Sequence, residues 1–379
     1  MFVIINIEKR MFMKSCYIHI PFCEHICTYC DFCKMYYNPE WVNQYLDSLE
    51  EEIKTNYNGE TLATIYIGGG TPTCLSNTQL EKLFKILELL NREADCEYTI
   101  ETNVESLNID KIKLLVQYGI NRVSIGVQSI IPENIKYLGR HHTKNQVQDL
   151  VENLNKNNIN NINVDLIYAL ECQNLESLME DLNFVLSLDI KHVSTYSLII
   201  EDNTKLGIRK QEPIDDDLDY QMYECIKGVL QKDNFIHYEI SNFSKEGYQS
   251  IHNLTYWNNE GYYGFGLGAS GYIGNIRYDN TRSLNKYLEG QYRLNEEYLD
   301  LNRKIENEFI LGLRKVNGIN KNTFKEKYGR DILSVNIVKD LVNQGQLIDD
   351  GENIFIDRNQ IYVSNHILLN FIGGIYGED

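Results

Sequence analysis

Short apolar runs alternate with longer amphipathic stretches along the first half of the chain. The apolar runs predict strands at 16–20, 63–67, 98–100, 122–127, 162–167 and 192–199. The amphipathic stretches, of which the second has Ser76 as a plausible N-cap, predict helices at 40–53, 77–91, 110–118, 145–157 and 175–188. This alternation indicates right-handed crossovers and a parallel sheet. A closed barrel of this kind has eight units, so the six units here predict an α/β fold with an incomplete (β/α)6 barrel; a doubly wound sheet is the alternative.

The pattern changes after residue 200. The acidic run at 215–217 is typical of the start of a solvated helix, and 238–243 predicts a further strand. Residues 256–278 are rich in glycine and aromatic side chains, and this region is too aromatic to be a flexible linker. Two short strands around Asp350 and Gly351 predict a hairpin. They follow helical stretches at 304–314, 321–328 and 335–344, and together these elements indicate a small, mainly helical, winged-helix-like domain.

These changes of pattern divide the chain into four parts. We expect an N-terminal extension at 1–16, the partial barrel at 17–240, a connecting region at 241–300 and a C-terminal helical domain at 301–379. No internal repeat and no low-complexity tract interrupts them.

Composition and charge narrow the functions that this fold can have. The 379 residues include 36 Lys and Arg against 54 Asp and Glu, which gives a net charge of −18. So acidic a chain disfavours nucleic acid as a partner, and we expect a packing or lid role for the winged-helix-like domain. We find no apolar run long enough for a transmembrane segment and no secretory leader, which leaves peripheral association with a membrane open. We therefore expect a cytoplasmic protein in a reducing compartment.

Residues suited to chemistry gather at the carboxyl ends of the predicted strands. A cysteine-rich loop follows the first strand, three glycines at 68–70 follow the second, and Glu101 lies at the end of the third. Gln128 ends the fourth strand, and Asp165 lies within the fifth. Because the carboxyl ends of the strands of a parallel barrel surround one mouth, these residues predict a common site there.

Four of the nine cysteines lie within eleven residues, at Cys23, Cys27, Cys30 and Cys33. In a reducing compartment, clustered cysteines indicate metal or redox chemistry rather than disulfides. The C-x3-C-x2-C spacing of the first three suits a [4Fe–4S] cluster with one iron left open, whereas electron carriers use four thiolates. Zinc takes four ligands, so a zinc site completed by Cys33 or His25 is one alternative, and unrelated thiols are another.

Eight short motifs follow one another between residues 17 and 257: YIHIPFC, IGGGTPT, IETN, RVSIGVQS, LGRHHT, VDLIY, YEISNF and HNLTYW. With these motifs the chain resembles the radical S-adenosylmethionine (SAM) superfamily. Within it, the chain resembles the branch that holds oxygen-independent coproporphyrinogen III dehydrogenases and the HemW-type haem chaperones. This resemblance implies a radical-SAM partial barrel with a [4Fe–4S] cluster and SAM as cofactors. The C-terminal pattern agrees, because members of that branch carry a small helical domain after the barrel.

The resemblance also implies roles for individual residues. The three cysteines of the C-x3-C-x2-C motif, Cys23, Cys27 and Cys30, would bind the cluster. The positions that contact SAM in the family are matched by Tyr17, Tyr29, Gly69, Gly70, Thr71 and Glu101. The positions that bind a second SAM in the dehydrogenases are matched by Gln128, Arg140 and Asp165. Without the resemblance, the glycines could form only a tight turn, and Asp165 could be a satisfied residue of the barrel interior.

Two details favour the haem-chaperone branch over the dehydrogenases. The dehydrogenases carry a fourth cysteine two residues after the third, and a long N-terminal extension. Here Phe32 takes the place of that cysteine, Cys33 follows one residue later as a bystander, and the stretch before Tyr17 is short.

The HNLTYW motif is the third detail, because it matches the H-N-x-x-Y-W element of the haem chaperones. It implies haem binding by His252, Asn253, Tyr256 and Trp257. An imidazole can ligate haem iron, and aromatic rings can cover the macrocycle; taken alone, His252 could equally be a surface or capping histidine. Weaker candidates for a haem ligand are His19, His25, His141 and His142.

One loop departs from the family pattern. The family has D-L-I-Y-G-L-P-G-Q after the fifth strand, whereas the sequence at 165–173 is DLIYALECQ. The loss of two glycines and a proline should alter the backbone of this loop at the barrel mouth.

The resemblance favours a haem chaperone that carries a [4Fe–4S] cluster and SAM, binds haem and passes it to an acceptor protein. A reductant such as flavodoxin or ferredoxin is a further expected partner. The alternative is an oxygen-independent coproporphyrinogen III dehydrogenase or another radical SAM oxidoreductase that acts on a tetrapyrrole. Whether the chain is an enzyme stays open between these two functions.

Overall fold

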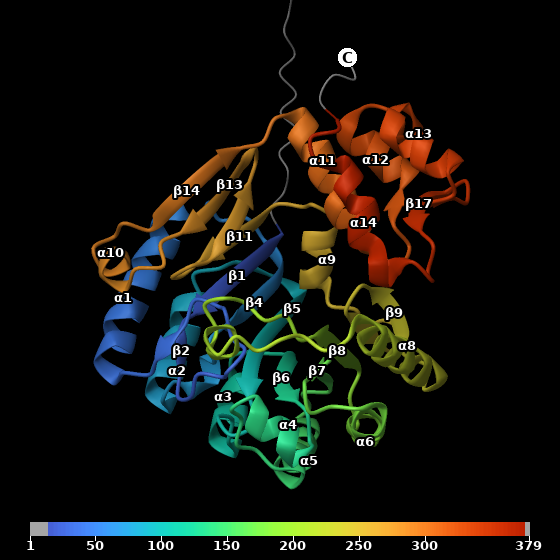
Figure 1. Ribbon diagram of the computed structural model, residues 1–379. Helices are drawn as coiled ribbons and strands as arrows, with labels where there is room; N and C mark the ends of the chain where they lie inside the picture. Colours follow the sequence, from blue (N-terminus) through green and yellow to red (C-terminus); the bar gives the residue numbers. More distant parts are fainter. Residues whose placement is uncertain (1–13, 376–379) are drawn as a thin grey trace, which may run out of the picture.

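The computed structural model describes residues 14–375, so most of the predicted extension at 1–16 lies outside the described residues. Six parallel strands form the centre of the molecule (Figure 1): β1 (Ser15–Ile20), β4 (Leu62–Gly69), β5 (Arg92–Asn103), β6 (Arg122–Gln128), β7 (Asn161–Tyr168) and β8 (His192–Ser197). They pair in chain order, each parallel to the next. The six predicted strands and the α/β fold class are confirmed.

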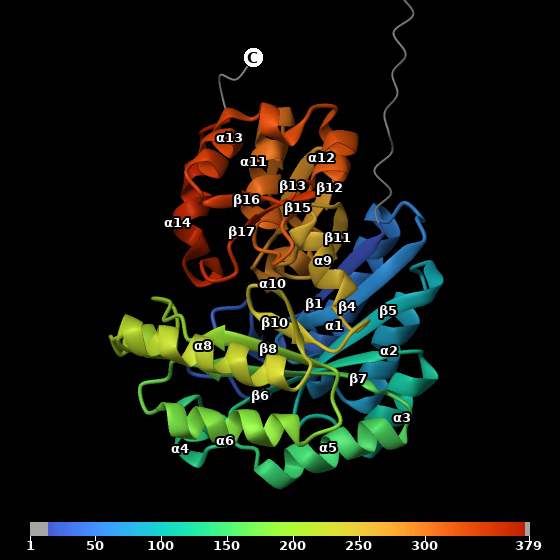
Figure 2. The ribbon, with the colours of Figure 1, turned by 90° about the vertical axis from the view of Figure 1, so that its right-hand side faces the viewer.

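Helices connect these strands and cover one face of the sheet (Figure 2). They are α1 (Pro39–Asn56), α2 (Asn77–Leu87), α3 (Ile109–Gln117), α4 (Pro132–Tyr137), α5 (Lys144–Lys156) and α6 (Leu175–Leu186). All but α4 were predicted. Ser76 caps α2 as expected: its hydroxyl accepts from the Gln79 N–H, while the Gln79 side chain accepts from the Ser76 N–H.

Side chains alternate along the strands, which gives the sheet one apolar and one polar face. On β4, Ile65 and Ile67 are fully buried in the core beneath the helices. Thr64 and Tyr66, from the same strand, face the barrel interior, where they contact His252 and Tyr17. The polar face supplies the walls of the candidate site.

Residues 238–243 were predicted as one strand, and this prediction was wrong. They contain the turn of a hairpin between β9 (Ile236–Glu239) and β10 (Asn242–Ser244), which extends the sheet beyond β8. The carboxylate of Glu239 fixes the reversal by accepting from the Ser241 N–H and the Asn242 side-chain amide. Before this hairpin come the short α7 (Lys205–Ile208) and α8 (Asp216–Lys232). Asp215 caps α8, so the predicted helix start at the acidic run is confirmed.

The glycine-rich and aromatic region continues the same sheet on the other side of β1. β11 (Tyr262–Phe265) lies parallel to β1, and β12 (Ser270–Ile273), β13 (Ile276–Asn280) and β14 (Arg293–Tyr298) follow as antiparallel strands. The sequence pattern did not predict these strands. Over residues 14–375 the sheet has twelve strands, and it stays open because β9 and β14 are its two edges. The same region holds the helices α9 (Ile251–Trp257) and α10 (Leu284–Leu288).

The C-terminal residues form a unit with a hydrophobic core of its own. Its helices are α11 (Leu301–Gly312), α12 (Lys321–Tyr328), α13 (Asn336–Asn343) and α14 (Ser364–Leu368). Its three-stranded sheet contains β15 (Ile319–Asn320), β16 (Leu347–Asp349) and β17 (Asn353–Ile356). The predicted hairpin is the β16–β17 pair, so the winged-helix-like arrangement is confirmed. Figure 1 shows this unit beside α9.

The remaining elements are short. A two-stranded parallel sheet beside β1 pairs β2 (Phe22–Cys23) with β3 (Met35–Tyr36). Single turns of 3-10 helix occur at Pro72–Cys74, Ile332–Ser334, Ile361–Val363 and Leu369–Phe371.

Candidate functional site

The barrel interior is lined by polar side chains that bond to one another across strands. Asn163 on β7 donates to the Ser124 hydroxyl on β6 and to Asp165, each at 2.7 Å. The His192 ring on β8 bonds to the Asn163 side-chain oxygen at 2.6 Å. Such a network costs little to bury because its members satisfy each other. It therefore confirms that Asp165 lies in the interior, while its role towards SAM remains a prediction.

The cysteine loop, residues 23–33, crosses the carboxyl end of β1. Cys23 is buried in β2. Thr71 lies just after β4, and its hydroxyl donates to the Cys23 sulfur at 3.7 Å. Arg140 donates to the Cys27 sulfur at 3.5 Å. Two main-chain hydrogen bonds of Thr28 attach the loop to its surroundings. The Thr28 N–H donates to the Leu138 carbonyl, and the Thr28 carbonyl accepts from the Leu206 N–H.

Burial and nearby thiols dominate the electrostatics of the loop. Burial raises the pKa of the Cys23 thiol to about 12, and the Cys30 and Cys27 sulfurs add to this effect, whereas Thr71 and Arg140 oppose it. Bound iron would supply the positive charge that holds such thiols as thiolates. Among residues 14–375 no three His, Cys, Asp or Glu side chains converge on the position of one metal ion. The donor set is three soft sulfurs on one loop, which fits an iron–sulfur cluster.

Gly70 keeps open the space between the cysteine loop and β4. A Cβ there would lie 2.6 Å from the Phe22 carbonyl oxygen and 2.9 Å from the Cys23 sulfur. The preceding Gly69 has a left-handed φ of +112°, and a Cβ on it would lie 2.6 Å from the His19 ring. Glycine has no Cβ to clash at either position, and it adopts the left-handed φ of Gly69 without strain. The predicted role of these glycines, close backbone approach to a ligand, fits this geometry.

Glu101 links the glycine turn to the interior. Its carboxylate accepts from the Gly69 N–H at 3.0 Å and from the Tyr66 hydroxyl at 2.8 Å. Burial raises the pKa of Glu101 to about 7, with nearby Asp165 acting in the same direction. A cationic ligand group beside Glu101 would lower this pKa, which fits the predicted contact with the ammonium group or ribose of SAM.

The residues predicted for a second SAM carry unsatisfied polar atoms. Gln128 has a left-handed φ of +71°, unusual for a residue with a side chain. Within the described residues, its side-chain oxygen and the Nε of Arg140 are buried without a partner. Arg140 donates to the Gly126 carbonyl as well as to the Cys27 sulfur. Tyr29 lies close to Arg140 and Cys27, and its burial raises its pKa well above the usual value. Unpaired polar atoms of Gln128 and Arg140 could bond to a small polar molecule, so this corner fits one.

The departing loop after β7 keeps a turn that glycine would favour. Ala169 has a left-handed φ of +64°, at the position where the family pattern has glycine. An alanine in this conformation costs roughly 1–2 kcal/mol. The substitution therefore leaves strain at the barrel mouth.

Helix α9 carries the HNLTYW motif into the interior. His252 is 1% exposed; its Nδ1 bonds to the Thr64 hydroxyl at 2.8 Å and its Nε2 to the Tyr256 hydroxyl at 2.7 Å. Its ring stacks on Tyr66 with centroids 5.0 Å apart, and burial lowers its pKa to about 3. Both ring nitrogens are thus occupied, and a ligand could reach Nε2 only if Tyr256 moved. Asn253 and Trp257 are only partly buried, and the Trp257 indole N–H has no partner in the described chain.

Tyr66 joins the two sets of predicted residues. Its hydroxyl donates to Glu101, its ring stacks on His252, and its ring centroid lies 6.1 Å from that of Tyr17. The residues predicted for SAM and for haem are therefore neighbours in the interior, although they are far apart in the sequence.

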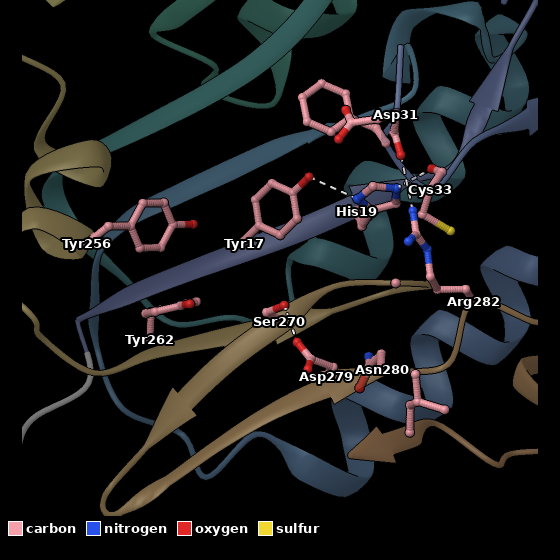
Figure 3. A pocket seen from close by; sticks show the side chains of 13 residues that line it. Tyr17, His19, Asp31, Cys33, Tyr256, Tyr262, Ser270, Asp279, Asn280 and Arg282 are labelled. Atoms are coloured by element: carbon pink, nitrogen blue, oxygen red, sulfur yellow. Dashed lines mark hydrogen bonds between the residues drawn. The ribbon is translucent and has the colours of Figure 1, made fainter. Parts of the chain in front are cut away.

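A cavity of about 560 Å³ opens beside these residues, between β1, the cysteine loop and the β12–β13 pair (Figure 3). Tyr17 and His19 form one wall, and the Tyr17 hydroxyl bonds to His19 Nδ1 at 2.9 Å. His19 Nε2 bonds to the Cys33 carbonyl at 2.7 Å. The lining residues are Tyr17, His19, Asp31, Phe32, Cys33, Tyr256, Tyr262, Gly268, Ser270, Asp279, Asn280, Arg282 and Leu294. Of the four residues predicted to bind haem, Tyr256 alone is in this set.

Comparison with known proteins identifies the family to which this site belongs. The sequence model of the Radical SAM superfamily matches residues 17–185. The chain is 41% identical over 369 residues to the heme chaperone HemW of Lactococcus lactis, covering 95% of this chain and 97% of that relative. The corresponding protein of Bacillus subtilis is 38% identical over 383 residues, covering 95% of this chain and all of that relative. The chain belongs to the HemW family of radical SAM proteins.

A solved structure supports the fold of this HemW-family chain. The Escherichia coli coproporphyrinogen III oxidase HemN, described as a radical SAM enzyme, superposes with a TM-score of 0.82 at 22% identity. The match covers 94% of this chain and 89% of HemN. The predicted radical-SAM barrel with a helical C-terminal part is confirmed. In the described part of this HemW-family chain, no helix is both long and apolar enough to cross a membrane.

Sequence reasoning missed several residues of the site in this HemW-family chain. Tyr66 is a partly buried polar residue within the mostly apolar β4, which was a usable signal, whereas Glu97 is a buried carboxylate in a strand that begins with charged residues. Arg282, Tyr262 and Asp279 come from the unpredicted strands or the turn after them. No local signal could place them beside the cysteine loop.

Proposed function

We propose that this HemW-family chain is a haem chaperone, which binds haem beside the HNLTYW helix and passes it to an acceptor protein. The observation that carries the proposal is the position of His252. Its ring stacks on Tyr66, and it bonds to Tyr256, which lines the cavity and separates His252 from it. The HemW relatives in L. lactis and B. subtilis carry the name heme chaperone.

The chemistry of His252 suits this role. Because its pKa is about 3, the ring is neutral at any physiological pH, and a neutral imidazole is the form that binds iron. The Tyr256 hydroxyl bonds to Nε2 of His252. Movement of Tyr256 would open Nε2 towards the cavity, and its ring would then be free to cover the macrocycle.

The cofactors would be held by the residues already described. We propose that Cys23, Cys27 and Cys30 bind a [4Fe–4S] cluster, and that Gly69, Gly70, Thr71, Glu101 and Tyr17 surround SAM. When bound, these groups supply one-electron chemistry. An electron donor such as flavodoxin or ferredoxin, a cytoplasmic location and peripheral membrane contact belong to the same proposal.

A spectral titration of the anaerobically reconstituted chain with haem tests the proposal. We expect a haem-dependent absorbance change in the wild type that His252→Ala reduces at least tenfold in affinity, a loss of about 1.4 kcal/mol. The matched control is His237→Ala, because His237 is also buried with a pKa lowered to about 4 but lies on β9, away from the cavity.

Two results would contradict the assignment. The first is a wild type that shows no haem-dependent change. The second is conversion of coproporphyrinogen III at catalytic turnover in an anaerobic assay, which would favour the dehydrogenase instead.

A further inference from the structure

Arg282 places an uncompensated positive charge at the rim of the cavity. It follows β13 directly, and its side chain is exposed. Its guanidinium donates to the main-chain carbonyl of Asp31 at 3.2 Å and contacts the Cys33 thiol. Within residues 14–375, no carboxylate lies within ion-pair distance of it. The charge therefore remains available to an anion.

The rest of the cavity combines aromatic rings with polar side chains, which suits a flat ring system that carries polar groups at its edge. Figure 3 shows Tyr256 and Tyr262 at one end and Arg282 at the other, with Tyr17 and His19 along the wall between them. The Tyr256 and Tyr262 rings pack edge to face, with centroids 4.6 Å apart. A volume of about 560 Å³ lies within the range of ligand sites, which is about 300–1,000 Å³. Aromatic walls and one free guanidinium match a macrocycle that carries a carboxylate at its edge.

The two acidic residues of the lining limit how such a molecule can lie. Asp279 accepts from the Ser270 hydroxyl at 2.6 Å on the floor formed by β12 and β13. The side chain of Asp31 is exposed at the rim, where its own carbonyl is the group that contacts Arg282. A carboxylate would be repelled by Asp279 along the floor, and Arg282 is the cationic residue of the lining that could attract it.

We propose that Arg282 binds a propionate carboxylate of haem, with the macrocycle lying in the cavity against Tyr256 and Tyr262. This inference rests on the proposed function and names the anchor of its ligand. Guanidinium and carboxylate pair in a bidentate, charge-assisted arrangement, which lysine reproduces only in part. The bond of Arg282 to Asp31 would be exchanged for the stronger contact with the propionate.

The test compares haem with haem dimethyl ester, in which the propionates are uncharged. Both probes are titrated against the anaerobically reconstituted wild type, Arg282→Gln and Arg282→Lys. We expect Arg282→Gln to weaken haem binding about tenfold, because the neutral amide cannot make the charge-assisted, bidentate contact with the propionate. Its affinity for the ester should equal that of the wild type. Arg282→Lys should fall between the two for haem.

The control is Arg277→Gln, since Arg277 lies on β13 but stacks over Tyr272 and does not line the cavity. Iron per chain is measured for every variant, because Arg282 touches the cysteine loop. Equal haem affinity of wild type and Arg282→Gln overturns the inference and leaves the proposed function in place. Equal losses for haem and ester also overturn it, since the contact would then not involve the propionate. A wild type that binds no haem overturns the proposed function and this inference together.

Discussion

At the scale of single residues, the site depends on buried polar groups, and their hydrogen-bond partners offset the cost of burial to different extents. Asp165 has partners in Asn163 and Ser124. The carboxylate of Glu101 has two donors, yet its pKa still rises from 4.5 to about 7 because it is buried. Burial therefore favours a protonated Glu101, and a cationic ligand group beside it would favour the ionised carboxylate.

Glu101 should make the stability of the ligand-free protein depend on pH. Its folded-state pKa lies above its unfolded value, so the folded state binds the proton more tightly. That stabilisation is complete below about pH 4.5 and is lost as the pH rises through 7. Glu101→Gln removes this pH-dependent stabilisation. The free energy of unfolding of the variant, relative to that of the wild type, should therefore rise by up to about 3 kcal/mol between pH 5 and pH 8, at about 1.4 kcal/mol per pKa unit.

Urea unfolding at several pH values measures this difference. The control is Glu105→Gln, since Glu105 is exposed on the following loop and should shift nothing. Parallel stability curves for wild type and Glu101→Gln would show that the carboxylate is already ionised in the folded state. The amide can keep both contacts, because the Tyr66 hydroxyl can accept as well as donate.

At the scale of elements, a carboxylate from β5 holds the first turn of α9. Glu97 on β5 accepts from the main-chain N–H groups of Ile251 and His252, each at 3.0 Å. It is 6% exposed. Because α9 carries His252, this contact sets where the imidazole lies relative to Tyr66.

Glu97→Gln should therefore weaken haem binding without affecting the cysteine loop. The amide oxygen can still accept from one of the two main-chain N–H groups, without charge assistance, but the other N–H faces the amide NH2, so we expect a loss of about 1–3 kcal/mol in stability. Haem affinity should fall several-fold while iron per chain stays constant, as measured by titration and metal analysis. Asp95→Asn on the same strand is exposed and serves as the control. An unchanged haem affinity in a destabilised Glu97→Gln protein would separate α9 from the haem site.

The elements also show what sequence patterns can and cannot predict. The six barrel strands were predictable because buried parallel strands are continuous apolar runs bounded by glycine and polar residues. β11 and β12 were not predictable, because their glycines have low strand propensity. These glycines are needed because of residues on neighbouring strands: a Cβ on Gly271 would clash with the Tyr278 ring. Local motifs singled out the cysteines, Glu101 and the HNLTYW segment as candidates, although no helix was predicted for that segment. Arg282 was not, because its role depends on a contact with Asp31 across 251 residues of sequence.

At the scale of the whole molecule, α9 lies between the barrel and the C-terminal unit, in contact with β4 and with α11. The barrel core and the C-terminal core are separate clusters. They are joined by main-chain bonds from the Ile240 N–H to Arg314 and from the Val316 N–H to Tyr238. Asn259, just after α9, adds side-chain bonds to the Lys304 carbonyl at 3.1 Å and to the Tyr328 hydroxyl at 3.3 Å. The C-terminal unit can thus restrain α9 without touching the cysteine loop.

Replacing Asn259 tests this coupling. Asn259 has a left-handed φ of +49°, so Asn259→Gly removes the side-chain bonds without adding backbone strain. We expect a loss of about 1 kcal/mol in the free energy of unfolding, since two hydrogen bonds disappear and a glycine gains freedom in the unfolded chain. Haem affinity should fall with it, because the end of α9 is released, and iron per chain should not change. The matched control is Asn234→Gly, which replaces a left-handed, exposed asparagine after α8. If Asn259→Gly binds haem like that control, the C-terminal unit contributes stability alone and the position of α9 is set by Glu97.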